Sequence, residues 1–468
     1  MSFVSPLVVA GHEVWPLVEG GKGVAVSNGR SAGAWAAAGG VGTFSAVNAD
    51  VLDANGDYVP LVFKGRDRRE RHEELIDYSI RGAVCQARVA HETQGGEGRL
   101  HMNVLWEMGG CERVLHGVLQ QAKGLVHGVT CGAGMPYRLG EICASYGVHY
   151  YPIISSARAF NALWKRAYGK VADWLGAVVY EDPWRAGGHN GLSNSEDPTR
   201  PEDPYPRVLE LRKLMRGMGL GDVPIIMAGG VWHLKDWKSW IGNKELGPIA
   251  FQFGTRPLLT QESPIPNGWK KRLLGLLPDD VLLHRFSPTG FYSSAVKNRF
   301  LEELVERSDR QVAISDEADP ASERTAFFAY GRGGRGVYVT EADLLRIQGW
   351  LSQGYSQPMR TPDSTLIFVT PEGARQIRRD QADCMGCLSH CAFSNWKDRD
   401  DFSTHRPVDP RSFCIQKTLQ DIAHGRGEHE DQLMFAGHNV YKFREDPFYA
   451  NGFVPTVRQL VQRILTGH

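Results

Sequence analysis

Short apolar runs alternate with helical segments from about residue 16 to residue 263. The apolar runs are nearly continuous instead of alternating with polar residues, which is typical of strands that are covered on both faces. They span Pro16–Glu19, Gly42–Val47, Leu100–Leu105, Gly124–Thr130, Val148–Ile154, Leu175–Glu181, Val223–Ala228 and Ile249–Gly254. The segments between them are amphipathic or rich in alanine, at Ser31–Ala38, Asp67–His91, Cys111–Ala122, Tyr137–Tyr146, Ala157–Tyr168, Arg207–Met218 and Leu234–Gly242.

Strands that alternate with helices predict an α/β fold with a parallel sheet. Eight strands are the number that closes such a sheet into a (β/α)8 TIM barrel. We therefore predict a barrel domain over residues 1–265, with an open, doubly wound sheet as the alternative.

The second part of the chain, residues 266–468, lacks this alternation. Its polar stretch Ser308–Ala326 and its glycine–arginine stretch Gly331–Gly336 predict loops. The glycine–arginine stretch is not flanked by the strand and helix that a nucleotide-binding fingerprint requires. A helical pattern near Thr456–Thr466 closes the chain. We predict a C-terminal elaboration that packs on the barrel, with the final helix returning to it.

Charge and composition narrow the class of protein. The 468 residues include 53 basic and 53 acidic side chains, and 42% are hydrophobic, which indicates a globular chain without bulk attraction to nucleic acid or anionic lipid. No apolar stretch reaches the ~18 residues of a membrane span, and the N-terminal segment does not resemble a signal peptide. We therefore expect a cytoplasmic enzyme for a small-molecule substrate, with no membrane or nucleic-acid partner; the sequence does not indicate its oligomeric state.

Glycines gather where the predicted strands end. The chain has 53 glycines, and several follow the first, seventh and eighth strands, at Glu19–Gly23, Met227–Gly230 and Gln252–Arg256. In a closed barrel the chemistry lies at these carboxyl ends, and phosphate is commonly held after strands seven and eight. Glycine lets backbone N–H groups approach an anion, and Thr255 adds a hydroxyl donor. Tight turns that need glycine for conformational reasons are the alternative; three such turns at one rim favour a phosphorylated cofactor.

A histidine follows the sixth strand in a glycine-rich loop. The segment reads Arg185-Ala186-Gly187-Gly188-His189-Asn190-Gly191. A histidine at the catalytic rim can donate or accept a proton near neutral pH. We predict that His189 is the catalytic acid or base.

These motifs together resemble the nitronate monooxygenase (2-nitropropane dioxygenase) family of FMN-dependent barrels, which includes FMN enoyl reductases and quinone reductases. The matching segments follow the family's order over roughly the first 265 residues. They are Pro16–Arg30, Ala38–Gly42, His101–Val104, Thr130–Pro136, Ile154–Ala157, Ala186–Gly191, Ala228–Gly230 and Gln252–Ser263, and the last helix also resembles its counterpart.

The resemblance implies how FMN would be held. Its phosphate would lie against Gly229, Gly230, Gly254 and Thr255, and its ring near Gly20, Gly21 and Gly23, with Asn103 and Gln252 as polar contacts. Gly188 and His189 would lie near the flavin edge, with His189 facing the substrate. One departure is Lys22, where many members have methionine; it would place a charge near the flavin.

The resemblance also implies an activity. Oxidation of alkyl nitronates with O2, by a nitronate monooxygenase-like flavoenzyme, is the first expectation. The alternative is an FMN/[4Fe-4S] reductase that uses NAD(P)H or a ferredoxin on an enoyl, quinone or other unsaturated substrate. A third hypothesis is a binding protein in which the flavin is vestigial and zinc fixes the C-terminal segment.

Four of the eight cysteines fall within one short window. Cys384, Cys387, Cys391 and Cys414 have a C-x2-C-x3-C spacing followed by a distant fourth, which is typical of [4Fe-4S] ligands. Zinc is the rival metal, because it also binds four cysteines or three cysteines and a histidine; unligated thiols are the remaining alternative. The other cysteines, Cys85, Cys111, Cys131 and Cys143, are scattered and are expected in the core. We predict a cluster that exchanges single electrons with FMN if it lies close enough.

Overall fold

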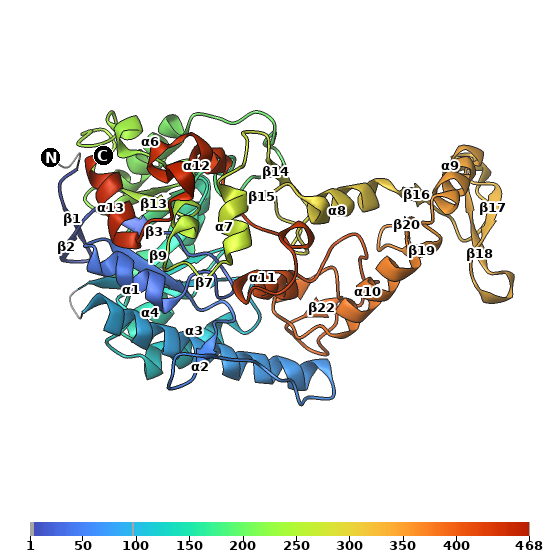
Figure 1. Cartoon of the computed structure of the whole chain (residues 1–468), viewed down its shortest axis with the longest axis horizontal. Coiled ribbons are helices and arrows are strands. Elements are labelled where there is room, and N and C mark those ends of the chain that lie inside the picture. Colours follow the sequence, from blue (N-terminus) through green and yellow to red (C-terminus); the bar gives the residue numbers. More distant parts are fainter. Residues whose placement is uncertain (1–3, 96–97, 468) are drawn as a thin grey trace. The chain divides into compact units, whose positions relative to one another are not determined.

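Eight parallel strands close into a barrel in the order β10-β12-β13-β3-β4-β7-β8-β9 (Figure 1). In chain order they are β3 (Leu17–Glu19), β4 (Val41–Ser45), β7 (Arg99–Leu105), β8 (Gly128–Gly132), β9 (His149–Ile154), β10 (Val178–Glu181), β12 (Ile225–Ala228) and β13 (Ile249–Phe253). This computed structural model describes residues 4–95 and 98–467. Each of the eight coincides with one of the predicted apolar runs, so the (β/α)8 barrel is confirmed and the open sheet is wrong.

The barrel strands are buried on both faces. Every residue of β4, β8 and β12 is buried, as the continuous apolar runs predict. The helices around the barrel are α1 (Gly29–Ala37), α2 (Arg68–Gln94), α3 (Cys111–Gln121), α4 (Leu139–Ser145), α5 (Ala157–Arg166) and α6 (Pro204–Gly217). Short 3-10 turns follow the last two strands, at η3 (Leu234–Trp237) and η4 (Arg256–Leu259).

Two glycines let the first helix lie directly on its neighbours. A Cβ at Gly42 on β4 would collide with the backbone of Ala32 on α1. A Cβ at Gly33 would meet the carbonyl oxygen of Ala90 on α2 at 2.5 Å. The side chain of Asn28 caps α1 by accepting a hydrogen bond from the Ser31 N–H at 2.8 Å, which satisfies one of the free amides at the helix start.

The last helix, α13 (Val457–Thr466), packs against α1 (Figure 1). Thr456 and Gln459 form a capping box at its start, an arrangement that satisfies two backbone N–H groups. Val457, Leu460, Val461, Ile464 and Leu465 form its buried face. The end of the chain therefore belongs to the same compact unit as its beginning.

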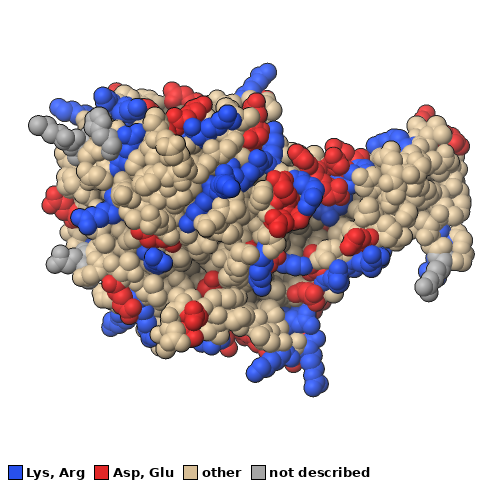
Figure 2. Space-filling model, in the orientation of Figure 1, with Lys and Arg blue, Asp and Glu red and all other residues tan. Residues whose placement is uncertain are grey.

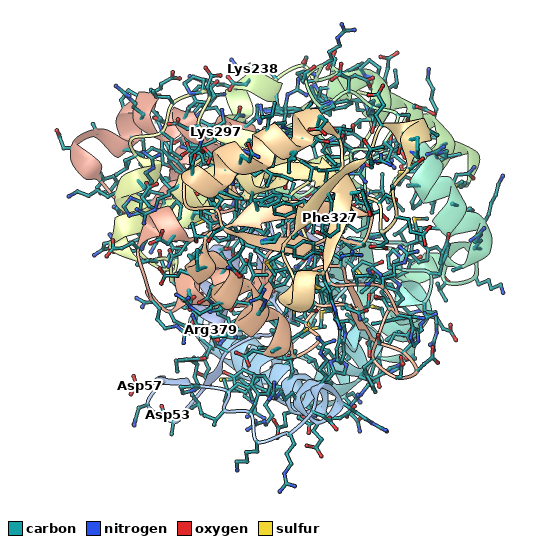
Figure 3. The ribbon with its side chains drawn as sticks, turned by 90° about the vertical axis from the view of Figure 1, so that its right-hand side faces the viewer. Asp53, Asp57, Lys238, Lys297, Phe327 and Arg379 are labelled. Carbon is teal, nitrogen blue, oxygen red and sulfur yellow. The ribbon has the colours of Figure 1, made fainter. Side chains whose placement is uncertain are left out.

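The chain divides into two compact units at places other than residue 265. Unit 1 contains residues 1–285, 291–296 and 416–468, and unit 2 contains residues 286–290 and 297–415. Unit 1 adds to the barrel the small sheets β1 (Leu7–Val9) with β2 (His12–Val14), β5 (Val51–Leu52) with β6 (Tyr58–Val59), and β11 (Gly188–His189) with β15 (Ser293–Val296) and β14 (Val281–His284). It also contains α7 (Asn267–Leu273), α11 (Ile415–Ala423, from its second residue), η7 (His429–Asp431), η8 (His438–Tyr441), α12 (Lys442–Glu445) and η9 (Pro447–Gly452). Asp53 and Asp57 mark the turn between β5 and β6 (Figure 3).

Unit 2 has an apolar cluster of its own. A sheet in the order β16 (Gln311–Ala313), β20 (Thr365–Val369), β19 (Gln357–Arg360) and a hairpin of β17 (Ala326–Ala329) with β18 (Gly336–Val339) supply most of its buried residues. Its helices are α8 (Arg299–Asp309), α9 (Glu341–Ser352) and α10 (Pro371–Ala382), with short turns η5 (Pro320–Ser322) and η6 (Arg332–Gly334) and a hairpin of β21 (His390–Cys391) with β22 (Trp396–Lys397). Phe327 on β17 is half exposed (Figure 3).

Acidic and basic side chains are interspersed over the visible face of the protein (Figure 2), in agreement with the balanced composition. No helix in residues 4–95 and 98–467 is long and apolar enough to cross a membrane.

The barrel should lose stability in acid because it buries an uncharged histidine. Burial, together with His127, His149 and Arg99, lowers the pKa of His101 to about 3. The unfolded chain binds that proton at its usual pKa near 6.5, so the free energy of unfolding should fall by about 1.4 kcal/mol per pH unit below 6.5. Burial also lowers the pKa of His127, to about 4, which acts in the same direction.

Urea unfolding at pH 7, 6 and 5 measures this dependence. The variant His101→Gln, which cannot titrate, should show a shallower slope than the wild-type protein. Equal slopes for the two proteins would contradict the assignment to His101.

Candidate active site

The predicted cofactor residues lie at the carboxyl ends of neighbouring strands. Gly20 and Gly21 directly follow β3. Gln252 is the next-to-last residue of β13, and Asn103 lies within β7. A Cβ at Gly20 would lie 3.3 Å from the Gln252 side chain and 3.2 Å from the Gly254 Cα. A Cβ at Gly21 would overlap the Asn103 side chain. The structure therefore brings these residues together at one arc of the rim, and two of them must be glycine for the close approach.

The turns after β12 and β13 both contain glycine. Gly229 and Gly230 have φ angles of 87° and 75°, a conformation that favours glycine. Nothing lies within 4 Å of the position a Cβ would occupy at Gly254, and the same holds at Gly23. Open space beside bare backbone and the neighbouring Thr255 hydroxyl together fit the phosphate of FMN.

The charge of Lys22 is balanced within the site. Its Nζ lies 3.0 Å from Glu19 Oε1 and 3.1 Å from the Gly20 carbonyl oxygen. Glu19 ends β3 and is completely buried, and the Ser31 hydroxyl also donates to its carboxylate at 2.7 Å. The lysine that departs from the family pattern is thus one half of an ion pair with Glu19, so its charge does not stand alone beside the cofactor residues.

A pocket opens on the other arc of the rim, after β8, β9 and β10. Its volume is about 160 Å³. The apolar part of its wall consists of Ala133, Met135, Ile153, Ile154, Ala159 and Phe291. Glu181, His189 and Asn190 supply polar groups. Strand β10, which borders the pocket, pairs with β12, which carries one of the glycine turns, so a substrate in the pocket would lie at the same rim as the cofactor.

The pKa of the Glu181 carboxyl group is raised above its ordinary value. Glu181 is the last residue of β10 and lines the pocket. Burial of its carboxyl group and, to a lesser degree, the charge of the adjacent Asp182 raise the pKa of Glu181 to about 8. A carboxyl group with such a pKa can donate a proton at neutral pH.

Asp182 shapes the loop that carries the histidine. Its Oδ1 accepts hydrogen bonds from the N–H groups of Trp184 and Arg185, both at 2.9 Å. Its Oδ2 lies 2.6 Å from an Arg185 guanidinium nitrogen. Because Asp182 is buried, these bonds tie the start of the loop to the end of β10.

His189 is placed by a strand from later in the chain. It lies in β11, which pairs with β15 so that His189 faces Ser293 and Gly188 faces Ser294. Burial lowers the pKa of His189 to about 4. At neutral pH the ring is therefore uncharged and can donate a hydrogen bond from one nitrogen while accepting at the other.

Asn190 offers an unsatisfied amide to the pocket. The residue is 5% exposed and lines the pocket, and neither its Oδ1 nor its Nδ2 has a hydrogen-bond partner. A buried amide without partners costs free energy unless a ligand or water satisfies it. Asn190 can thus bind a polar group of a ligand or a water molecule in the pocket.

A segment near the end of the chain borders the same rim. The strap, defined as residues 434–439, lies beside β15: the Val296 N–H donates to the Met434 carbonyl at 2.9 Å, and the Ala436 N–H donates to the Ser294 carbonyl at 3.3 Å. The rings of Phe435 and His189 have centroids 5.4 Å apart. The strap therefore helps to hold the loop that carries His189.

Sequence reasoning missed Glu181, the amide of Asn190 and the strap. Glu181 could have been found, because it is a polar residue at the carboxyl end of a barrel strand, where catalytic groups gather. The strap has no comparable local signal, since its role depends on contacts with residues more than a hundred positions earlier in the chain.

Nothing in the described residues supports a metal site on the four clustered cysteines. Within the described residues, no group of three or more His, Cys, Asp or Glu side chains could hold a metal ion. Cys384 and Cys391 are buried, and the Ser394 hydroxyl donates to the Cys384 sulfur at 2.9 Å. Burial and the neighbouring Cys384 raise the pKa of Cys391 to about 11, which keeps it a neutral thiol.

The [4Fe-4S] cluster and the zinc alternative predicted on Cys384, Cys387, Cys391 and Cys414 are therefore not supported. Spacing along the chain is a local property, whereas a metal site needs four sulfur atoms to converge. Of the scattered cysteines, Cys111, Cys131 and Cys143 are buried as expected, and Cys85 is partly exposed.

Comparison with known proteins gives one family match. The family model described as nitronate monooxygenase matches residues 111–465, well over half of the chain. No curated protein matches the sequence significantly.

Solved structures resemble the chain at low sequence identity. The enoyl reductase domain of MlnA from Bacillus amyloliquefaciens is 13% identical, with a TM-score of 0.53 over 96% of this chain and 92% of that one. FabK from Thermotoga maritima is also 13% identical, with a TM-score of 0.49 over 96% and 91%. Nitroalkane oxidase from Streptomyces ansochromogenes is 20% identical, with a TM-score of 0.43 over 62% and 79%. The first of these extends the likeness in fold over nearly the whole chain.

Proposed function

Because this chain belongs to the nitronate monooxygenase family and is a flavin-dependent oxidoreductase, we propose that it reduces a carbon–carbon double bond conjugated to a carbonyl group. The substrate class is an α,β-unsaturated acyl compound such as an enoyl thioester. FMN supplies the hydride when it is bound, and NAD(P)H or an electron-transfer protein supplies the electrons to FMN.

The observation that carries this proposal is the Glu181 carboxyl group in the pocket, whose pKa is raised. Reduction of a conjugated double bond adds a hydride at the β-carbon and a proton at the α-carbon. Glu181 lines the pocket, and partial removal of its carboxyl group from water raises its pKa to about 8. It is therefore suited to protonate the α-carbon, whereas His189, with its pKa lowered to about 4 by burial, carries no extra proton to give at neutral pH.

The remaining polar groups are suited to hold the substrate carbonyl. The free Nδ2 of Asn190 and the neutral ring of His189 can donate hydrogen bonds to an oxygen that gains negative charge as the hydride arrives. Apolar side chains such as Ile153, Ile154 and Phe291 would contact the hydrocarbon chain. A mostly apolar wall with a few convergent polar groups is typical of sites for such ligands.

Oxidation of alkyl nitronates is the second candidate, favoured by the description of the matching family. A nitronate is an anion, and a fixed cation would favour its binding. The pocket offers neutral donors instead, because Glu181 is protonated and His189 is uncharged at neutral pH. The proposed function includes no step through an iron–sulfur cluster.

Steady-state kinetics without oxygen tests the proposal. The purified protein should bind FMN and should oxidise NADH or NADPH only when an enoyl thioester such as crotonyl-CoA is present, with the saturated thioester as control. The opposite outcome is an FMN-bound protein that does not oxidise NADH or NADPH with the enoyl compound but consumes oxygen with propionate 3-nitronate. That result would favour the second candidate over the proposal.

A further inference from the structure

The strap lies against the turns to which the FMN phosphate is assigned. Its N-terminal part pairs with β15, and farther along the His438 N–H donates to the Arg185 carbonyl at 3.2 Å. The two residues next to His438, Gly437 and Asn439, contact the turns after β13 and β12. All of these residues belong to unit 1.

Gly437 orients the Thr255 hydroxyl by a hydrogen bond. The Gly437 N–H donates to Thr255 Oγ1 at 2.8 Å. A threonine hydroxyl that accepts such a bond still has its own proton to donate. The contact therefore orients Thr255 as a donor, which is the role an anion requires.

Asn439 fixes the turn after β12. Its Nδ2 donates to the Gly230 carbonyl oxygen at 2.5 Å. Gly229 and Gly230 both have positive φ, so the turn depends on two peptides that glycine leaves free to rotate. The bond to Asn439 restrains that rotation and keeps the N–H groups of the turn in one arrangement.

The backbone of the strap lies directly against the backbone of the loop that contains Arg185 and Gly187. A Cβ at Gly437 would lie 2.7 Å from the Arg185 carbonyl oxygen and 3.2 Å from Thr255 Oγ1. A Cβ at Gly187 would lie 2.6 Å from the Gly437 nitrogen. Alanine at Gly437 would therefore push the strap away from the two elements that it joins.

We propose that the strap is part of the FMN phosphate site, with Gly437 and Asn439 as positioning residues that act through Thr255 and the Gly229–Gly230 turn. The inference rests on the proposed binding of FMN and adds a segment nearly two hundred residues away in sequence. It also links the cofactor to the catalytic loop, because the same strap packs Phe435 against His189.

A comparison of FMN with riboflavin measures the contribution of the phosphate to binding. Riboflavin has the same ring and ribityl chain as FMN but no phosphate, so a residue that positions the phosphate site should affect FMN and not riboflavin. Full-length protein freed of flavin can be titrated with each compound, and binding can be followed by flavin fluorescence.

The key variant is Asn439→Asp, which keeps the size of the side chain, removes the donor to Gly230 and adds a negative charge. Loss of the bond together with repulsion of the phosphate should weaken FMN binding by at least about tenfold. Riboflavin binding should stay within about twofold, and the melting temperature without flavin should stay near that of the wild type. Asn439→Ala removes the same bond without adding a charge, so it should give a smaller loss that is again selective for FMN.

The matched control is Asn243→Asp, because Asn243 makes a similar bond to the Ser239 carbonyl, at 2.9 Å, away from the glycine turns. It should leave the affinities for both flavins unchanged. Equal losses for FMN and riboflavin in the strap variants, or no loss, would overturn the role of the strap while leaving the proposed function intact. A wild-type protein that binds neither flavin would overturn both.

Discussion

Replacing Glu181 with glutamine should slow the reduction of an enoyl thioester by about a hundredfold or more, because removal of a general acid typically costs 10²–10⁴ in rate. Glutamine fills nearly the same volume at the end of β10 but has no proton to give to the α-carbon. FMN should remain bound, since Glu181 is not among the residues assigned to hold it and glutamine preserves its size. Stopped-flow measurement of flavin reoxidation by the substrate gives the rate.

The pH dependence sharpens this prediction. The wild-type rate should fall as the pH rises through about 8, where burial places the pKa of Glu181 and the acid loses its proton. This fall should be absent from Glu181→Gln. The control is Glu210→Gln on the exposed side of α6, which should behave as the wild type. A Glu181→Gln variant with normal rate and an unchanged pH profile would show that the proton comes from elsewhere.

Replacing Asp446 with alanine should destabilise unit 1 by about 3–5 kcal/mol, the usual cost of leaving a buried charge without its partner. The Asp446 carboxylate is 3.1 Å from Arg256 and 3.0 Å from Arg463, and it accepts a hydrogen bond from the Trp232 indole at 3.1 Å. Arg256 follows the turn after β13 and is 1% exposed, so its guanidinium cannot find water instead. Thermal unfolding should show a melting temperature lower by roughly 5–10 °C.

An exposed ion pair nearby provides the comparison. Lys442 and Asp236 lie 3.9 Å apart, again between the C-terminal segment and the region after β12, and both are partly exposed. Surface pairs of this kind contribute about 0–1 kcal/mol, so Asp236→Ala should hardly change the melting temperature. Equal effects of Asp446→Ala and Asp236→Ala would contradict the buried-charge argument.

The barrel could be predicted from the sequence because each strand has its own local signal. A strand covered on both faces must be apolar at nearly every position, and this requirement appears directly in runs such as Val223–Ala228. The predicted ends were less accurate. The run that begins at Gly124 forms a strand only from Gly128, because Gly124 has a φ of 83° and lies in the turn after α3.

The candidate site could be predicted where one short segment carries the chemistry. The glycines directly follow β3, β12 and β13 in the sequence, so their position at the rim follows from the positions of the strands. His189 was equally visible, but its position depends on β15, about a hundred residues later. Such long-range pairings leave no local pattern.

For the clustered cysteines, a local pattern predicted a metal site that the described residues do not support. Cys391 lies in the β21–β22 hairpin and Cys414 precedes α11. Their spacing matches a cluster motif, but the path of the backbone decides whether the four sulfurs meet. Glu181 could not be assigned a raised pKa from the sequence, because the shift arises mainly from removal of its carboxyl group from water in the fold and only partly from the adjacent Asp182.

The central claim is that a protonated acid and an FMN site act together on a conjugated double bond. One single-turnover experiment tests it most directly: the FMN-bound protein is reduced without oxygen and then mixed with an enoyl thioester while the visible flavin absorbance is recorded. The oxidised flavin spectrum should return with the formation of one saturated thioester per flavin. Flavin that stays reduced with the enoyl compound, while the oxidised protein is reduced by an alkyl nitronate, would contradict it.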